Sequence, residues 1–237
     1  MAQRLARCPT IHGRAVLGRE RDVGHDQHDQ DPAEMYTQAT WDARYAESSR
    51  IWSGRPNQRL VEEVSELVPG TALDVGCGEG ADAVWLAERG WTVTALDVSQ
   101  VALTRVREHA AEAGVADRVE TLHHDLVAGG RAPGRYDLVS VFFFHVMPEV
   151  FEEFYRGLAE LVAPGGTLLV VGHHPDDVDS GARRPHGPQL LFTPEQVVGV
   201  LDAADWDVVT QSAPTREMAT AEGEVTVTDS VVRAVRR

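Results

Sequence analysis

The stretch LDVGCGEGADAVWLAERG, residues 73–90, decides the fold. It continues a short apolar run, TALDV (71–75), that predicts a buried strand. Three glycines then fall within five residues, and the apolar spacing beyond them predicts a helix over 80–89 that ends at Gly90. A strand, a tight glycine turn and a helix in this order are typical of an α/β sheet whose ligand lies at the turn.

Strand-like and helix-like segments alternate through the rest of the chain. The expected strands, besides 71–75, cover 91–99, 118–125, 136–144, 167–174, 206–213 and 224–237. The other expected helices cover 57–68, 100–113, 151–162 and 193–204. The alternation predicts a doubly wound parallel sheet. The last two strands are joined by an exposed connection without a helical crossover, so one of them is expected to run antiparallel.

Composition excludes several classes of function. The 237 residues carry a formal net charge of -15, which disfavours a binder of nucleic-acid backbones and leaves a small molecule as the expected partner. The chain contains no lysine, which excludes lysine Schiff-base chemistry and a Walker-type phosphate loop. Cys8 and Cys77 are the only cysteines, too few for a disulfide framework or a zinc cluster, and we expect no metal.

The two ends of the pattern define one expected domain. Residues 1–34 are polar, show no sustained apolar period and are expected to be a disordered tail, whereas 35–237 form the folded domain. Met35 stands where the folded pattern starts, which suggests the hypothesis that it is the natural first residue. No apolar run is long enough to span a membrane and no apolar signal core is present, so a cytoplasmic protein is expected.

Acidic residues stand at the ends of three consecutive strands. Asp74 precedes the first glycine of the turn by two residues, Asp97 ends the next strand and Asp125 follows the third. The letters GCGEGA also satisfy the dinucleotide pattern G-x-G-x-x-A, but a carboxylate at Asp74 would repel a pyrophosphate. It suits a cationic ligand without phosphate, and S-adenosylmethionine, with its ammonium and sulfonium groups, meets that description.

The other two carboxylates have matching roles toward an adenosine. Asp97 lies 21 residues after Gly76, where an acidic residue accepts hydrogen bonds from the ribose hydroxyls of a nucleotide. Asp125 can accept from the adenine amino group while Leu126 packs against the ring. Each aspartate alone is equally well explained as a helix cap. Three at successive strand ends beside the glycine turn favour the ligand.

Several motifs resemble those of one family in order and spacing. ALDVGCGEG (72–80), VTALDVS (93–99), DL (125–126) and RYDLVSVFFFHVMPE (135–149) resemble the successive motifs of class I S-adenosylmethionine-dependent methyltransferases. The resemblance covers about 41–237 and implies a Rossmann-like seven-stranded sheet of order 3-2-1-4-5-7-6 with strand 7 antiparallel. The cofactor-binding residues it implies are Asp74, Gly76, Cys77, Gly78, Gly80, Asp97, Val98, Asp125, Leu126 and Phe144.

The segment WDARYAESSRIWSGRPN, residues 41–57, looks like the N-terminal region of small-molecule members near the tellurite and thiol methyltransferases. The resemblance implies that Trp41, Tyr45, Trp52 and Asn57 form a lid over the cofactor. Trp41 and Tyr45 are four residues apart and are equally well explained as core packing on a helix. Asn57 also suits the N-cap of the helix that follows it.

Methyl transfer from a sulfonium is an in-line displacement in which the protein mainly aligns the reactants and excludes water. A base is needed only for an acceptor that arrives protonated. His145 after the fourth strand and His173 after the fifth are the candidate catalytic residues, with His174 as a neighbour. The long segment 175–190 is expected to be a mobile lid, and an anionic acceptor or a merely solvated loop would both explain its Arg183, Arg184 and His186.

Other functions stay open at this point. An NAD(P)-dependent reductase is disfavoured by Asp74 and by the lack of a Tyr-x-x-x-Lys pair. A nucleic-acid methyltransferase is disfavoured by the charge and by FFFH where amino-methylating enzymes carry [DNS]-P-P-[YFW]. A regulatory protein that binds S-adenosylmethionine without turnover fits the same motifs. The sequence leaves the acceptor atom open among sulfur, oxygen, nitrogen and a metalloid oxyanion, and it leaves the oligomeric state open too.

Overall fold

A computed structural model describes residues 37–128, 130–182, 187–221 and 223–237. The predicted tail over 1–34 lies outside these ranges, as do Arg183, Arg184 and His186. The described strands are β1 (Thr71–Val75), β2 (Thr92–Asp97), β3 (Val119–His123), β4 (Tyr136–Phe142), β5 (Val162–His173), β6 (Trp206–Ser212), β7 (Thr215–Thr220) and β8 (Gly223–Arg236). The described α-helices are α1 (Gln38–Ala46), α2 (Gln58–Val64), α3 (Ala81–Glu88), α4 (Gln100–Glu112), α5 (Phe151–Glu160) and α6 (Pro194–Val200).

The strands form one sheet of order β3-β2-β1-β4-β5-β8-β6, in which β7 pairs only with β8. β3, β2, β1, β4 and β5 run parallel, and β8 runs antiparallel to both β5 and β6. The predicted order 3-2-1-4-5-7-6 is confirmed, with β6 as the sixth strand and β8 as the antiparallel seventh. The Rossmann-like, doubly wound α/β class is confirmed with it.

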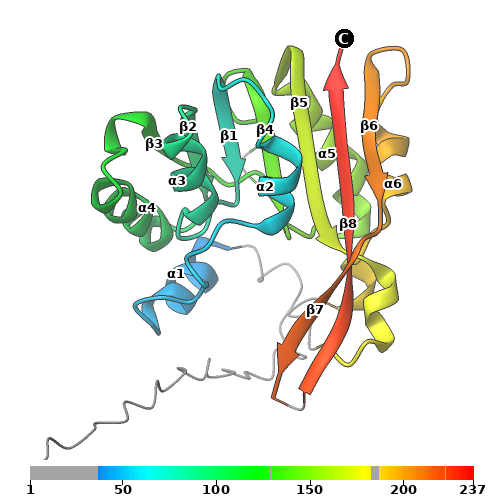
Figure 1. Ribbon diagram of the computed structural model, residues 1–237, viewed down its shortest axis with the longest axis horizontal. Coiled ribbons are helices and arrows are strands. Elements are labelled where there is room, and N and C mark those ends of the chain that lie inside the picture. Colours follow the sequence, from blue (N-terminus) through cyan, green and yellow to red (C-terminus); the bar gives the residue numbers. More distant parts are fainter. Residues whose placement is uncertain (1–36, 129, 183–186, 222) are drawn as a thin grey trace, which may run out of the picture.

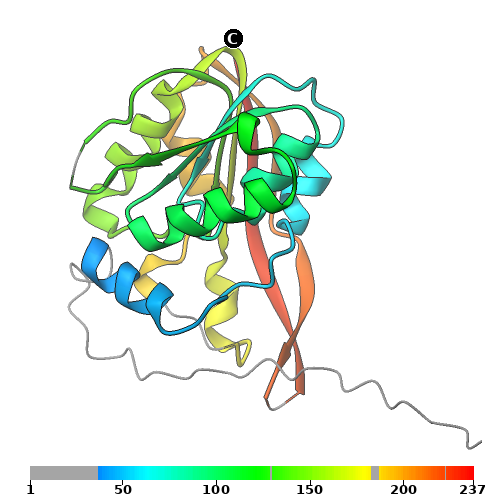
Figure 2. The same ribbon diagram turned by 90° about the vertical axis from the view of Figure 1, so that its left-hand side faces the viewer.

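Helices cover both faces of the sheet (Figure 1). The core over the face of α2 and α3 contains Leu60, Val64 and Leu86, and the core over the face of α5 and α6 contains Phe154, Leu158 and Val197. α1 lies outside these layers, at the edge where β1 and β2 end (Figure 1, Figure 2). No helix among the described residues is long and apolar enough to cross a membrane.

One segment differs from the expectation. The connection TREMATAEGE, residues 215–224, was expected only to be exposed and to contain no crossover helix, and it forms β7 and the start of a long β8, which pair from Thr215–Thr228 to Thr220–Gly223. Its side chains alternate between exposed and half-buried, a pattern without an apolar face, and the pairing with β8 provides the order instead. This hairpin projects past the end of β5 in Figure 1.

Two helices are shorter than expected. α2 ends at Val64 rather than 68, and α6 ends at Val200 rather than 204. After α6 the backbone of Leu201 is extended, and the side chain of Asp202 accepts a hydrogen bond from the N–H of Ala204, which fixes a turn in place of a further helical turn. At its other end α6 begins as expected, with Gln196 accepting from the N–H of Thr193 at 2.8 Å.

Candidate cofactor and active site

The glycine turn between β1 and α3 needs its glycines for conformational reasons. Gly76, Gly78 and Gly80 have φ angles of 66°, 54° and 83°, in the left-handed region that side chains other than glycine rarely adopt. A Cβ atom on Gly80 would also lie 2.9 Å from Cγ2 of Val106 on α4. Gly80 therefore allows α3 and α4 to pack closely, whereas Gly76 and Gly78 shape the turn itself.

Asp97, at the end of β2, fastens the turn to the neighbouring strand. Its Oδ2 accepts the N–H of Gly78 at 2.9 Å and its Oδ1 accepts the N–H of Ser99 at 2.8 Å. The residue is only 7% exposed, and this burial raises the pKa of its carboxyl. Each oxygen retains a second lone pair, so Asp97 can still accept from ribose hydroxyls as predicted.

Asp74 carries a buried oxygen atom without a partner. The residue is 2% exposed, and its Oδ2 has no hydrogen-bond partner among the residues that the structure describes. Burial, with the negative charges of Asp82 and Asp97, raises the pKa of Asp74 well above its usual range. Leaving such an atom unsatisfied is costly, so the arrangement fits a bound cation or hydrogen-bond donor. The ammonium of S-adenosylmethionine is both.

Aromatic side chains of the N-terminal segment lie on the turn. The indole N–H of Trp52 donates to the hydroxyl of Tyr45 at 3.2 Å, and a Cβ atom on Gly78 would lie 2.9 Å from that hydroxyl oxygen and 3.3 Å from Nε1 of Trp52. Trp41 packs against Tyr45 with ring centroids 5.9 Å apart. Tyr45 is buried but Trp52 is 44% exposed. Tyr45 thus combines the two predicted roles, because it packs inward and also covers the turn.

The loop after β4 reaches the same turn from the other side. Phe143 is the one non-glycine residue with a positive φ, 52°, among the described residues, and its N–H donates to the carbonyl of Val171 at 2.8 Å. This turn directs Phe144 toward β1, where its ring lies 2.7 Å from the position of a Cβ atom on Gly76. Phe144 also stacks on Phe154 at 5.0 Å, which fixes the ring.

His145 connects the ends of β4 and β5. Its Nε2 accepts the backbone N–H of His173 at 3.1 Å, which places the ring proton on Nδ1, 3.0 Å from the carbonyl oxygen of Phe143. The rings of His145 and His173 stack at 5.0 Å, and Phe143 stacks on His173 at 4.5 Å. Both ring nitrogens of His145 are therefore engaged by the backbone, so accepting a further proton requires the bond to His173 to break.

Comparison with known proteins identifies the family. Residues 72–166 match the family described as "Methyltransferase domain". These residues form a methyltransferase domain. The chain is 31% identical over 152 residues to the 2-heptyl-1-hydroxyquinolin-4(1H)-one methyltransferase of Mycobacteroides abscessus, covering 61% of this chain and 63% of that protein. The matches span 38% to 63% of the length of the first curated relatives.

Solved structures share the fold of the methyltransferase domain. TehB from Haemophilus influenzae superposes with a TM-score of 0.64 at 18% identity, over 84% of this chain and 67% of that one. The glycopeptide N-methyltransferase MtfA, in complex with S-adenosylmethionine, gives 0.57 at 20% identity, over 77% and 88%. The predicted methyltransferase family is confirmed for residues 72–166, and S-adenosylmethionine, the cofactor predicted with it, is part of the function proposed below. At these identities the likeness to TehB concerns the fold alone, and the narrower placement near tellurite and thiol methyltransferases stays a prediction.

Two other residues predicted to bind the cofactor make structural contacts. Oδ1 of Asp125 accepts the N–H groups of Val127 and Ala128, each at 2.9 Å, and so caps the turn after β3. Oδ1 of Asn57 accepts the N–H of Arg59 at 2.9 Å and caps α2, as the second interpretation of this residue predicts. These contacts leave the adenine and lid roles of the two residues as predictions.

Three further predicted residues lie close to the turn or to the end of β3. The N–H of Cys77 donates to the carbonyl of Leu96 at 3.0 Å, and burial raises the pKa of its thiol well above the usual value. The carbonyl of Val98 lies 2.9 Å from Nε2 of His123. Leu126 packs on the core beside α5. They therefore lie along the edge of the sheet where the adenosine part is expected, without deciding its position.

Sequence reasoning missed four charged residues at this edge of the sheet. Oδ1 of Asp82 accepts the N–H of Asn57 at 2.6 Å, and Oδ1 of Asp42 accepts the hydroxyl of Ser99 at 2.6 Å. Glu79 and Arg105 form an ion pair at 2.7 Å, with side chains only 5% and 13% exposed. A signal for Glu79 was present, because a carboxylate between two glycines of a buried turn needs a partner.

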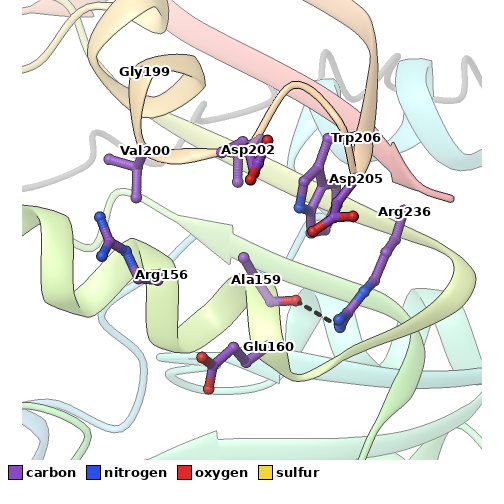
Figure 3. A pocket seen from close by; sticks show the side chains of 10 residues that line it. Arg156, Ala159, Glu160, Gly199, Val200, Asp202, Asp205, Trp206 and Arg236 are labelled. Atoms are coloured by element: carbon purple, nitrogen blue, oxygen red, sulfur yellow. Dashed lines mark hydrogen bonds between the residues drawn. The ribbon is translucent and has the colours of Figure 1, made fainter.

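Two clefts lie away from this edge. The larger, about 510 Å³, lies between the C-terminal ends of α5 and α6 and the start of β6 (Figure 3). There Arg236 donates to the carbonyls of Ala159 and Val162, and so satisfies backbone carbonyls at the C-terminal end of α5. The smaller, about 390 Å³, is lined by residues at the starts of β1, β4 and β5. Both lie at the amino ends of the parallel strands, whereas ligands of this fold collect at the carboxyl ends.

Proposed function

We propose that the chain is an enzyme that transfers the methyl group of S-adenosylmethionine to a small molecule. The observation that carries the proposal is the buried Oδ2 of Asp74 beside the glycine turn, which has no hydrogen-bond partner in the described part of the chain. A reductase that uses NAD(P) would bring a negatively charged pyrophosphate to this turn, next to the carboxyl groups of Asp74, Asp82 and Asp97. Like charges that lie close together in a partly buried site repel each other. A cationic cofactor without phosphate removes this conflict.

The residues of the chain have distinct tasks in this mechanism. S-adenosylmethionine, when bound, supplies a methyl group already activated on a sulfonium. Asp74 would hold its ammonium group, and Asp97 its ribose hydroxyls. Tyr45, Trp52 and Phe144 exclude water from the turn, and aromatic faces favour a nearby cation by about 0.5–2 kcal/mol each. Catalysis then depends mainly on the alignment of the acceptor atom with the methyl carbon and the sulfur.

The two histidines remain proposed acceptor-side residues. With its proton on Nδ1 and Nε2 bound to the N–H of His173, His145 is better suited to position the loop after β4 than to remove a proton. An acceptor that is ionised in solution needs no base. The related quinolone methyltransferase, by its name, acts on a ring compound with a hydroxyl group. We therefore propose a small ring compound with an acidic hydroxyl or thiol as the acceptor.

The proposal extends to the partners and the location of the protein. The net charge of -15 disfavours a nucleic-acid substrate, and we propose that the enzyme acts in the cytoplasm. We retain residues 35–237 as the extent of the domain.

Calorimetry with S-adenosylmethionine and with NAD tests the cofactor. We expect binding of S-adenosylmethionine alone, weakened in Asp74→Asn. Binding of NAD and not of S-adenosylmethionine would overturn the proposal. Release of S-adenosylhomocysteine, measured across a panel of phenols, N-hydroxy compounds, thiols and tellurite, then identifies the acceptor. A protein that binds the cofactor but releases no product with any of them would be a regulatory protein and not an enzyme.

A further inference from the structure

The carboxylate of Glu79 lies in the glycine turn, and both of its oxygens accept hydrogen bonds from other groups of the protein. The residue is 4% exposed. Its Oε2 accepts the backbone N–H of Trp52 at 2.8 Å, both oxygens lie within 3.2 Å of the backbone nitrogen of Ile51, and Oε1 accepts from Nη1 of Arg105 at 2.7 Å. Glu79 therefore fixes the backbone of the residue whose indole covers the turn.

Arg105 extends this connection to the end of α1. Its Nη2 donates to the carbonyl oxygens of Tyr45 and Ser48, while its Nη1 pairs with Glu79. Its guanidinium carbon lies 5.7 Å from the centroid of the Tyr45 ring. A cation that satisfies the free carbonyls at a helix C-terminus stabilises that end. One guanidinium thus holds the helix that carries Tyr45 and the carboxylate that holds Trp52.

Two further contacts fix the ends of the segment 37–57, which we call the lid segment. Near its start, Asp42 accepts the hydroxyl of Ser99 at 2.6 Å and the N–H of Val101 at 3.2 Å. At its end, the N–H of Asn57 donates to Asp82 at 2.6 Å. Between these points, Glu79 and Arg105 make the buried contacts. Opening the lid segment therefore breaks the hydrogen bonds of Glu79 to the backbone of Ile51 and Trp52, and those of Arg105 to the carbonyls at the end of α1, which leaves two buried charged groups with fewer partners.

We propose that Glu79 and Arg105 are positioning residues that hold the Tyr45–Trp52 pair over Gly78 and thereby set the affinity for the cofactor without touching it. The inference rests on the proposed function, because it takes the Gly78 turn as the cofactor site. It is independent of the acceptor. It also explains why a glutamate follows Gly78, at a position where a side chain pointing toward the ligand would add a charge to a site that already has Asp74 and Asp97.

The test combines a readout without cofactor and one with it. In Glu79→Gln the volume is retained, but the charge that pairs with Arg105 is lost. We expect the backbone amides of 47–57 to exchange hydrogen for deuterium faster in the cofactor-free variant, with peptides from β1 and α5 unchanged. Calorimetry should show the Kd for S-adenosylmethionine raised roughly tenfold or more, the size of effect that loss of a charge-assisted hydrogen bond gives.

Matched variants separate positioning from general damage. Glu62→Gln removes the carboxylate of an ion pair with Arg59 at 2.8 Å whose Glu62 side chain is 42% exposed, and it should leave both readouts at wild-type values. The double variant Glu79→Gln with Arg105→Gln removes both charges and should bind no more weakly than the single variants, since the two act as one unit. If Glu79→Gln fails to fold, Glu79→Asp with its shorter reach takes its place.

Each outcome decides the proposal. Faster exchange in 47–57 together with weaker cofactor binding supports it. Unchanged exchange, or faster exchange with unchanged affinity, overturns it. Failure of the proposed function is recognised separately, because wild-type protein would then not bind S-adenosylmethionine at all, while the exchange of the cofactor-free variants would still show whether Glu79 holds the lid segment.

Discussion

Asp82→Asn is expected to raise the free energy of unfolding at neutral pH, because the folded variant no longer contains this buried carboxyl that must ionise. Burial raises the pKa of the Asp82 carboxyl from 3.8 to about 6, even though its Oδ1 accepts the N–H of Asn57 at 2.6 Å. Asparagine keeps the acceptor for that N–H and does not ionise. The nearby Asp74 and Asp97 are also buried, and no ion pair among the described residues neutralises any of the three.

The direction and size follow from proton binding. Between pH 3.8 and about 6 the folded protein holds the proton of Asp82 while the unfolded chain has lost it. The free energy of unfolding therefore falls as pH rises through this window, and the stabilisation is complete only below it. A shift of this size corresponds to about 3 kcal/mol. The pair with Asp74 titrates jointly, so the loss is spread over the window.

Urea unfolding followed by tryptophan fluorescence measures this effect. With wild type and Asp82→Asn compared at each pH from 4 to 8, the variant should gain about 2.5 kcal/mol relative to wild type between pH 4 and 7, because part of the window lies below pH 4. Ionisable groups other than Asp74, which is coupled to Asp82, change both proteins alike and cancel in the difference. A difference that stays constant with pH would refute the inference that Asp82 holds a proton in the folded protein.

The same carboxyls predict proton release when the cofactor binds. A positive charge beside Asp74 favours the ionised forms of Asp74 and Asp82, so S-adenosylmethionine should displace a proton near pH 6. The binding enthalpy measured there in phosphate and in imidazole buffer should differ, because the two buffers take up the proton with different enthalpies. At pH 8, where Asp82 is already ionised, the difference should shrink. Equal enthalpies at pH 6 would contradict the linkage.

Three further substitutions test the site. Asp97→Ala should raise the Kd for S-adenosylmethionine in calorimetry at least tenfold, since it removes the ribose acceptors and frees the N–H of Gly78; an unchanged Kd would dismiss the ribose role. His145→Ala should cost about 3 kcal/mol in urea unfolding, because two buried backbone groups lose their partner, and should lower turnover more than cofactor affinity. Equal losses of turnover and affinity would instead make His145 part of the cofactor shell. Gly80→Ala should cost about 2–3 kcal/mol against about 1 kcal/mol for Gly114→Ala, where φ is 72° but no atom lies within 4 Å; equal costs would mean that contact with α4 is unimportant.

The parts of the fold that sequence predicted well are those fixed by local pattern. The run TALDV and the three glycines after it determine a strand, a turn and a helix within 20 residues, and both ends of this unit lie close to where they were expected. The β7–β8 hairpin was missed because TREMAT has no apolar face of its own. Its order comes from pairing with β8, a strand that is buried at Val227 within the hairpin and at Val231 beyond it.

The residues of the site also divide into those that a local sequence pattern predicts and those that depend on contacts distant in sequence. Asp74 and Asp97 were predicted because parallel strands bring their carboxyl ends to one edge, so position along the chain is enough to place them together. Glu79 was missed because its partners lie 26 to 28 residues away, on α4 and on a segment without regular structure. For Asp125, the local alternative was also valid, since its side chain caps the turn that follows it. A short-range sequence pattern cannot distinguish a ligand-binding role from a capping role when one carboxylate oxygen accepts from the backbone and the other is still able to accept from a ligand.

Glu79 and Asp74 are five residues apart and both are buried, yet their surroundings differ in kind. Glu79 is neutralised by Arg105 and accepts two backbone N–H groups, so it has no remaining need for a ligand. Among the described residues Oδ2 of Asp74 has no hydrogen-bond partner, and the negative charges of Asp82 and Asp97 act on this carboxyl. A fold can retain an unpaired buried carboxylate only if something outside the chain compensates it, or if it stays protonated. Asp74 meets the second condition in the free protein and the first when a cationic ligand binds and displaces the proton. The calorimetric comparison of buffers measures this proton release directly.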